Sequence, residues 1–150
     1  LADNFGNWLR GDVLGILAAN YLGAVAVATP VSSNTALEKM GFARLVQRTR
    51  IGSPFVVDAM TRAGQQGLVP SVGYEANGGF LLANQVEKNN KVLDALPTRD
   101  SMLPMLCALV AAKVKGSVLS GLLVNLPSRF TLSDRLVEIP AEKVVKKFTT

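Results

Sequence analysis

Apolar positions recur with helical spacing from Asp12 to Leu22. They lie three and four residues apart and so form one stripe of a helix, made of Val13, Leu14, Ile16, Leu17, Tyr21 and Leu22. Gly23 follows and predicts a left-handed C-terminal cap. The next run, Ala24–Thr29, is small and β-branched throughout. Such a run is typical of a strand that is buried on both faces of a parallel sheet.

Strand and helix patterns keep alternating to about Lys115. The expected elements are a short helix, a strand, a longer helix and two short strands around a Gly/Asn-rich turn, over Thr35–Met40, Arg44–Arg50, residues 53 to about 64, Leu68–Tyr74 and Gly79–Leu82. Side-chain oxygens of the segment 32–34 are suited to cap the first of these helices. The segment 52–54 predicts the start of the second, with Ser53 as its N-cap and a proline in the first turn.

The clearest helical pattern covers Met102–Lys115. We expect Asp100 and Ser101 to cap this helix. Its larger apolar residues are expected to face the core, namely Met102, Met105, Leu106, Leu109 and Val110. Weaker patterns indicate a short helix, then a strand and a further helix near the C-terminus, at Val118–Leu126, near Leu136–Ile139 and after Pro140.

This alternation predicts an α/β fold, specifically a three-layer α/β/α sandwich with a mostly parallel, mixed sheet of about four strands. The length of 150 residues suits one domain, and 49% apolar with 18% charged residues is a globular composition. The more polar stretch 127–150 reads as a connector to a neighbouring domain. The longest apolar run, Met102–Ala112, is shorter than the ~20 residues that a membrane-spanning helix needs.

The residues that are missing exclude several kinds of chemistry. No histidine is present, which excludes a histidine base, a histidine zinc ligand and a serine–histidine triad. Cys107 is the single cysteine, lies among apolar residues, and is expected to be a core residue without a disulfide. Because the sequence also holds no N-glycosylation sequon, we expect a cytoplasmic location. The chain begins at Leu1 without a signal-peptide pattern, and we expect it to be a piece of a longer protein.

The net charge of +5 is unevenly distributed. Residues 1–112 hold nine Lys/Arg and eight Asp/Glu, whereas residues 113–150 hold seven and three. Nucleic-acid binding would require a basic stripe interleaved with aromatic residues, and only Phe130 and Phe148 lie in the basic end. A solvated face or linker is the favoured interpretation, so we expect no nucleic-acid partner and no membrane partner.

Three loops are expected at the C-terminal ends of the parallel strands, where α/β proteins bind ligands. The first loop (residues 30–35) and the second loop (49–54) each run into the start of a helix. Helix starts present unpaired N–H groups that suit anions, although plain helix capping explains the same residues. Arg48 and Arg50 alternate onto one side of their strand and could form a phosphate patch or a solvated edge.

The third loop (residues 73–80) is rich in glycine and asparagine. Three glycines permit tight turns and a close approach of a ligand to the backbone. Glu75 and Asn77 place a carboxylate beside a side-chain amide, a pair suited to vicinal sugar hydroxyls. A glycine-rich hairpin in which Glu75 merely faces water is the alternative.

Four motifs follow one another along the chain. They are Pro30–Leu37, then Thr49-Arg50-x-Gly52 with Phe55-Val56, then Gly-Tyr-Glu-x-Asn-Gly-Gly-Phe over 73–80, and finally Asp94–Ser101 before the long helix. In this order and spacing they resemble the α-D-phosphohexomutases, the family of phosphomannomutase, phosphoglucomutase and phosphoglucosamine mutase. The resemblance implies the third of that family's four domains over residues 11–126. Residues 1–10 would then end the preceding domain, and 127–150 would lead toward the fourth.

The resemblance implies an intramolecular phosphotransferase that moves a phosphoryl group between C1 and C6 of a hexose through a bisphosphorylated intermediate. The family's phosphoserine and its Mg²⁺, held by an Asp-Gly-Asp-x-Asp-Arg loop, belong to other domains, so this piece alone is expected to be inactive. Its implied partners are the hexose phosphate substrate and the other domains of the same polypeptide.

By motif match, Glu75 would bind one hexose hydroxyl and Asn77 the neighbouring one. Gly79 stands where several relatives have histidine. The other implied substrate-binding residues come from the three loops: Gly73, Tyr74, Arg50, Gly52, Ser53, Ser32 and Ser33. Ser53 and Pro54 depart from the residues common in the family, which leaves the sugar open among mannose, glucose and glucosamine. A non-catalytic α/β module that binds a ligand or partner is the alternative function.

Overall fold

The structure is a computed structural model that describes residues 1–88 and 90–133. Its elements follow the order expected from the sequence up to the third loop. The strand expected near Leu136–Ile139 and the helix expected after Pro140 lie outside the described residues.

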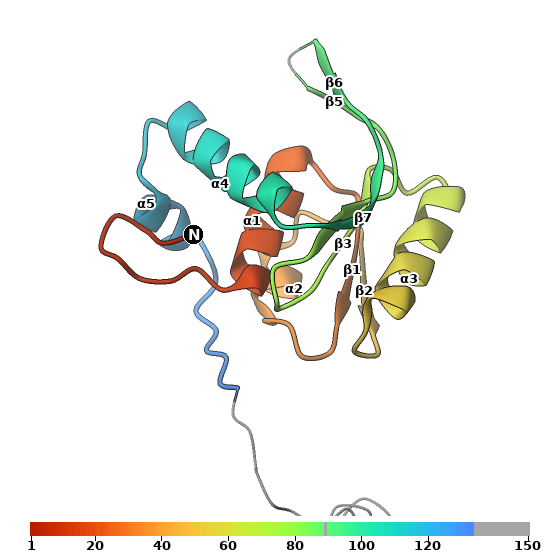
Figure 1. Cartoon of the computed structure of the whole chain (residues 1–150), viewed down its shortest axis with the longest axis horizontal. Coiled ribbons are helices and arrows are strands. Elements are labelled where there is room, and N and C mark those ends of the chain that lie inside the picture. The colour runs from red at the N-terminus through yellow and green to blue at the C-terminus, as the bar shows by residue number, and fades with distance from the viewer. Residues whose placement is uncertain (89, 134–150) are drawn as a thin grey trace, which may run out of the picture.

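A mixed five-stranded sheet forms the centre of the molecule (Figure 1). Its strand order is β2-β1-β3-β4-β7, and the bounds are Leu45–Thr49, Ala26–Pro30, Ser71–Tyr74, Phe80–Leu82 and Leu96–Asp100. β1 pairs in parallel with both β2 and β3, whereas β3–β4 and β4–β7 are antiparallel. The sheet therefore has one strand more than expected. The additional strand, β7, holds Pro97, which a sheet tolerates at an edge because one side of an edge strand makes no ladder bonds.

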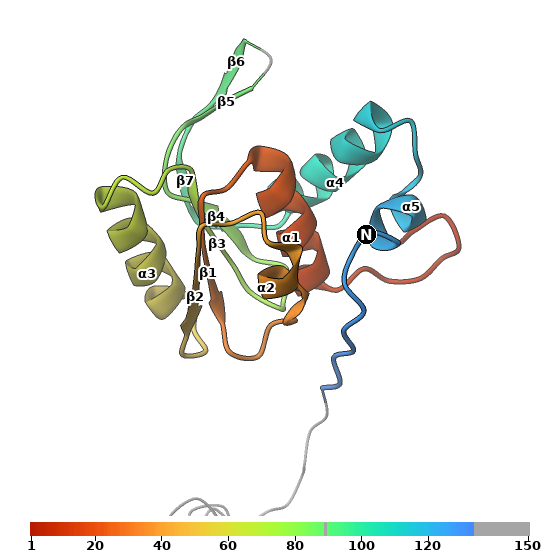
Figure 2. The ribbon, with the colours of Figure 1, turned by 180° about the vertical axis from the view of Figure 1, so that it is seen from behind.

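Helices cover both faces of the sheet, as expected for an α/β/α sandwich (Figures 1 and 2). α3 lies on one face, and α1, α2 and α4 lie on the other, with α5 beside α1 and α4. These helices span Ser53–Gln65, Gly11–Leu22, Ala36–Met40, Met102–Val114 and Leu119–Leu123. A hairpin of β5 (Val86–Lys88) and β6 (Lys91–Leu93), which the sequence pattern did not indicate, projects from the upper edge in Figure 1.

Successive residues along the strands are buried on opposite faces of the sheet. Val27, Val72 and Phe80 are fully buried in the cluster on the α1 side. Ala28 and Leu81 are buried on the α3 side, in a cluster with Val56, Ala59 and Met60 of that helix. Neighbouring residues on one strand thus face opposite layers, as a pleated strand requires.

The face that α4 buries is the reverse of the expected one. Its larger apolar residues are exposed to solvent by 41–59% of their surface, except for the half-buried Met105: Met102, Leu106, Leu109 and Val110. The buried residues are small, namely Pro104, Cys107, Ala108, Ala111 and Ala112. Small side chains let the α4 backbone approach α1 closely, and close packing of the two helices decides which face is covered.

Two helix caps also differ from expectation. Ser53 is the first residue of α3 and makes no capping hydrogen bond, and Gly52 holds the cap position with a φ of 128°. At the start of α4, Asp100 Oδ1 accepts a hydrogen bond from Leu103 N–H at 2.6 Å, while Ser101 makes no side-chain cap. The aspartate is therefore the capping residue of α4, as expected, and the serine is not.

Candidate functional site

The three loops gather at the lower edge of the sheet in Figure 1, at the ends of β1, β2 and β3. Parallel strands end at the same edge, which is why loops that begin 43 positions apart, at residues 30 and 73, meet there. Hydrogen bonds join the loops and the strand ends beside them. Val31 N–H donates to the Thr49 carbonyl at 3.0 Å, and the Thr29 hydroxyl donates to the Tyr74 carbonyl at 2.9 Å.

A buried carboxylate holds the first loop in place. Asp12, in the first turn of α1, is fully buried, and its Oδ2 accepts a hydrogen bond from Asn34 N–H at 3.0 Å. The Asn34 amide then donates to Thr131 Oγ1 at 2.9 Å and to the Arg129 carbonyl at 3.2 Å. The first loop is therefore fixed between the start of α1 and the chain segment after α5. From the sequence, Asp12 could be recognised only as a residue at the start of a helix, and its contact with Asn34 could not.

The two serines of the first loop differ in exposure. Ser33 is buried, and its Oγ lies 2.8 Å from Thr29 Oγ1, so its hydroxyl is engaged within the protein. Ser32 is exposed beside it and is the hydroxyl of this loop that faces solvent.

Arg48, on the neighbouring strand β2, holds the first loop in place through hydrogen bonds. Its guanidinium donates to three carbonyls at 2.9–3.1 Å, those of Pro30, Ser33 and Asn34. It also pairs with both oxygens of Glu38, which lowers the pKa of that carboxyl. With these donors engaged, Arg48 is a structural residue, and a phosphate patch shared by Arg48 and Arg50 is not formed.

The second loop presents Arg50 and the start of α3 to solvent. Arg50 is exposed, and its guanidinium carbon lies 5.7 Å from the centre of the Phe55 ring. Gly52, with its positive φ, makes the turn into the helix, and Ser53 is half-buried at its first position. A cation beside the positive end of a 13-residue helix gives this loop the chemistry of an anion site.

The third loop is a tight turn that closes on itself. Glu75 N–H donates to the Gly79 carbonyl at 2.9 Å, and Gly78 N–H donates to the Glu75 carbonyl at 3.0 Å. Gly78 has a φ of 97°, a conformation that side chains disfavour. Asn77 is exposed, and its Oδ1 accepts a hydrogen bond from Gly79 N–H at 3.1 Å. The NH₂ group of Asn77 is consequently the end that is available to a ligand.

Glu75 is buried, so the alternative of a hairpin in which this carboxylate merely faces water is wrong. Only 6% of the residue is exposed, and its Oε2 lies 3.2 Å from Nε of Arg99 on the edge strand β7. Among the described residues, this oxygen has no partner with hydrogen-bond geometry. Burying a carboxylate is unfavourable unless it is paired, and among the described residues Arg99 is the cation that pairs with Glu75. The sequence did not single out Arg99, which lies 24 positions from Glu75.

The two residues before Glu75 face the core rather than the loop surface. The Tyr74 ring is fully buried against Gly15, where a Cβ would lie 2.3 Å from the ring, and burial raises the pKa of its hydroxyl. A Cβ on Gly73 would lie 2.6 Å from Val56 of α3. Tyr74 and Gly73 therefore shape the buried base of the third loop.

Gly11, at the start of α1, lies directly against the backbone of the third loop. A Cβ at this position would lie 2.1 Å from the Gly78 nitrogen and 2.6 Å from the Ala76 carbonyl oxygen. The loop backbone therefore rests directly on the helix start. The sequence carries no motif that marks this contact, because it joins residues 67 positions apart.

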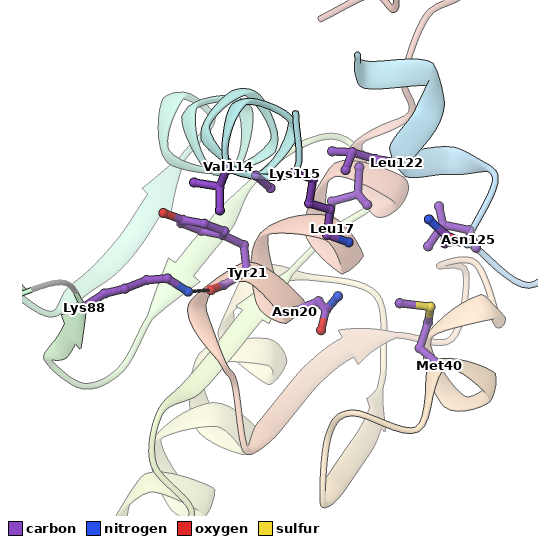
Figure 3. Close-up of a pocket in the computed structure, with 11 residues that line it drawn as sticks. Leu17, Asn20, Tyr21, Met40, Lys88, Val114, Lys115, Leu122 and Asn125 are labelled. Atoms are coloured by element: carbon purple, nitrogen blue, oxygen red, sulfur yellow. Dashed lines mark hydrogen bonds between the residues drawn. The ribbon is translucent and has the colours of Figure 1, made fainter. Parts of the chain in front are cut away.

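A separate cavity of about 270 Å³ lies between α1, α4 and α5 (Figure 3). Tyr21 lines it and lies ten residues along α1 from Gly11, about 15 Å at 1.5 Å per residue. Lys88 reaches into its wall, where its ammonium bonds the Tyr21 carbonyl and lies 4.0 Å from the centre of the Tyr21 ring. Its lining combines apolar side chains with lysine, asparagine and tyrosine side chains and contains no carboxylate.

Within residues 1–88 and 90–133, no three histidine, cysteine, aspartate or glutamate side chains gather in a way that could hold a metal ion. None of the helices in this part of the chain is long and apolar enough to cross a membrane.

Comparisons with known proteins agree with this arrangement. A family model described as phosphoglucomutase/phosphomannomutase, alpha/beta/alpha domain III, matches residues 10–130. A phosphomannomutase of Salmonella muenchen is 46% identical over 139 residues, and one of Sinorhizobium fredii is 40% identical over 143 residues. The two alignments cover 93% and 95% of this chain but 28% and 30% of the relatives, so the chain spans less than a third of their length.

A crystal structure assigned as a phosphomannomutase from Thermus thermophilus has a similar fold. The TM-score is 0.59 at 18% identity, over 77% of this chain and 24% of that one. At this identity the likeness concerns the fold, including the layered arrangement described above.

Proposed function

Because the chain belongs to the phosphoglucomutase/phosphomannomutase family, as its α/β/α domain III, we propose that it is the sugar-recognition domain of a phosphohexomutase. Such an enzyme interconverts hexose 1-phosphate and hexose 6-phosphate through a bisphosphorylated intermediate. Phosphoryl transfer depends mainly on positioning and on neutralising charge, so a domain that only holds the sugar contributes directly to the rate.

We also propose how the chain divides into domains. Residues 11–126 form the recognition domain, residues 1–10 end the domain before it, and residues 127–150 lead to the next. The 28–30% coverage of the two relatives supports a larger enzyme. The free Cys107 supports a cytoplasmic location for it.

The observation that carries the proposal is the pairing of Glu75 with Asn77 on the third loop. Glu75 Oε2 is buried and has no hydrogen-bond partner among the described residues, so it would accept a sugar hydroxyl once the carboxylate turns toward the loop surface. Asn77, two positions along the loop, presents an NH₂ donor. Two neighbouring sugar hydroxyls require such an acceptor and such a donor. The backbone of Gly73, Tyr74 and Gly79 would hold this pair in position.

The second and first loops would line the same cleft as the third loop. Arg50, the Gly52 turn and the half-buried Ser53 lie at the start of α3, whose N–H groups and dipole favour an anion. Exposed Ser32 would add a hydroxyl from the first loop, while buried Ser33 would hold that loop through Thr29.

The described residues do not gather a set of ligands that fits Mg²⁺. By the family resemblance, the metal and the phosphoserine would belong to other domains of the proposed enzyme, and no step through a metal is assigned to this chain. This chain's own contribution is to bind and orient the hexose phosphate.

Replacing Glu75 in the proposed full-length enzyme tests this function. Glu75→Gln keeps the size of the side chain and removes its charge, so kcat/KM for hexose 1-phosphate should fall by about a hundredfold, as expected when a positioning contact is lost. Glu87→Gln, an exposed substitution on β5, is the matched control and should leave kcat/KM unchanged.

A wild-type kcat/KM for the Glu75→Gln enzyme would contradict the role of Glu75. Absence of mutase activity in the wild-type enzyme, with binding of hexose phosphate retained, would favour a non-catalytic binding module instead.

A further inference from the structure

We infer that Arg99 is a substrate-binding and specificity residue of this site, which takes the phosphate oxyanion of the hexose phosphate next to Glu75. The inference rests on the proposed function and deepens it. It assigns the phosphorylated form of the sugar, rather than the free sugar, as the ligand of the third loop.

The position of Arg99 depends on the absence of a side chain at Gly79. A Cβ on Gly79 would lie 2.8 Å from Nε of Arg99 and 3.4 Å from its Nη2. The guanidinium therefore covers the end of the third loop. Gly79 is itself buried, and its φ is not in the left-handed region, so the requirement for glycine here is space rather than backbone conformation.

Arg99 has donors that the protein does not use. Its Nε faces Glu75 Oε2 at 3.2 Å. Within the described residues, the guanidinium makes an ion pair with Glu75 but no hydrogen bond, in contrast to Arg48, whose guanidinium makes five hydrogen bonds. The side chain is 50% exposed, so the outer N–H groups face solvent. A planar guanidinium with outward N–H groups matches the geometry of a phosphate.

Glu75 holds the Arg99 guanidinium in a fixed position. The buried carboxylate fixes the Nε side of the guanidinium and leaves the opposite edge to the ligand. The pair also places an acceptor for a sugar hydroxyl and a donor for a phosphate side by side. A ligand that carries both groups, such as a hexose phosphate, would engage both, whereas a free hexose would engage only Glu75.

The test is an NMR titration of the 150-residue chain with mannose 6-phosphate, glucose 6-phosphate and the two free sugars. Arg99→Gln should weaken hexose phosphate binding about tenfold, the loss expected for a charge-assisted contact, with a smaller loss for the free sugars. Arg99→Lys keeps the charge and should recover part of the affinity. Arg62→Gln, which removes the exposed pair with Asp58 on α3, is the control and should bind like the wild type.

Gly79→Ala gives a second, independent variant. The added Cβ displaces the flexible end of Arg99 and not the backbone, so the fold should be kept while affinity falls as in Arg99→Gln. Because both changes act on one contact, the double variant should bind no more weakly than Arg99→Gln alone.

Equal affinity of wild type and Arg99→Gln for hexose phosphates would overturn the inference and leave the proposed function intact. Parallel losses for phosphorylated and free sugars would also overturn it, because they would mean that Arg99 acts only through Glu75. A wild-type chain that binds no hexose phosphate would contradict the proposed function and this inference together.

Discussion

Single buried polar residues set the shape of the candidate site. Asp12 is fully buried and positions the first loop through Asn34, and Glu75 is buried and positions Arg99. Burying a carboxylate is unfavourable unless it is paired, so each of these side chains ties a loop to a second element. The geometry of the loops therefore follows from a few charged contacts beneath them rather than from the loop residues themselves.

Replacing Gly11 with alanine tests the contact between α1 and the third loop. The added Cβ would collide with the Gly78 backbone at 2.1 Å, and backbone cannot rotate away. We expect Gly11→Ala to lower the free energy of unfolding by about 1–3 kcal/mol, as overpacking does. It should also shift the amide resonances of residues 75–79. Urea unfolding and an amide NMR spectrum measure the two effects.

Gly121→Ala is the control for this prediction. Its Cβ would meet only the Ser117 hydroxyl at 2.2 Å, and that side chain can rotate away. If Gly11→Ala were as stable as Gly121→Ala and left the spectrum of the third loop unchanged, the loop would not rest on the start of α1.

Cys107 gives a prediction about pH. Burial raises the pKa of its thiol from 9.0 to about 11. Thiol reagents attack the thiolate, so labelling of the native chain should stay slow at neutral pH and accelerate only as pH approaches 11. Because the unfolded chain releases this proton at a lower pH, the free energy of unfolding should fall between about pH 9 and pH 11.

The labelling reports on one thiol, because Cys107 is the single cysteine of the sequence. A Cys107→Ala chain gives the background, and labelling in urea gives the fully accessible rate. Rapid labelling of the native chain at neutral pH would show that the thiol is not buried.

At the scale of elements, α4 differs most from expectation. Its larger apolar residues are partly exposed, and alanines fill the contact with α1. We expect Ala108→Leu, at a fully buried position, to lower the free energy of unfolding by about 1–3 kcal/mol through overpacking. Leu109→Gln, at a position 45% exposed, should change it by no more than about 0.5 kcal/mol. Urea unfolding followed by circular dichroism measures both.

The opposite ranking, with Leu109→Gln the more damaging change, would restore the face expected from the sequence. Glutamine is a good helix former, so the helix itself should persist in that variant.

The elements with a strong period were predicted from the sequence. The buried run that forms β1 and the Gly-Ser-Pro start of α3 both carry local signals, and the structure confirms those elements. The edge strand β7 was missed because its residues are polar and include Pro97. The orientation of α4 was missed because hydrophobic spacing alone does not distinguish large apolar residues from small ones that allow close helix packing.

The candidate site was predicted only in part, for a related reason. The glycine-rich third loop and its Glu75–Asn77 pair are visible in the sequence, since they lie within one motif. The burial of Glu75 is not, because its partner Arg99 lies on a strand that joins the sheet from a distant part of the chain. The contact of Gly11 with the loop is hidden for the same reason.

At the scale of the whole molecule, distant segments converge on one edge of the sheet. The start of α1, the ends of β1, β2 and β3, and the segment around Thr131 all meet at the three loops. The opposite edge carries the projecting hairpin β5–β6 and no strand-end loop of the site. We therefore expect ligand binding at the C-terminal ends of the strands.

The most direct test of the central claim is an amide NMR titration of the chain with a hexose 6-phosphate. We expect saturable shifts that concentrate on the third loop, residues 73–80, and on the start of α3, with the hairpin β5–β6 unaffected. If the amides of residues 73–80 stay unmoved at tens of millimolar ligand, or if the shifts gather around the cavity near Tyr21, the third loop does not recognise the sugar.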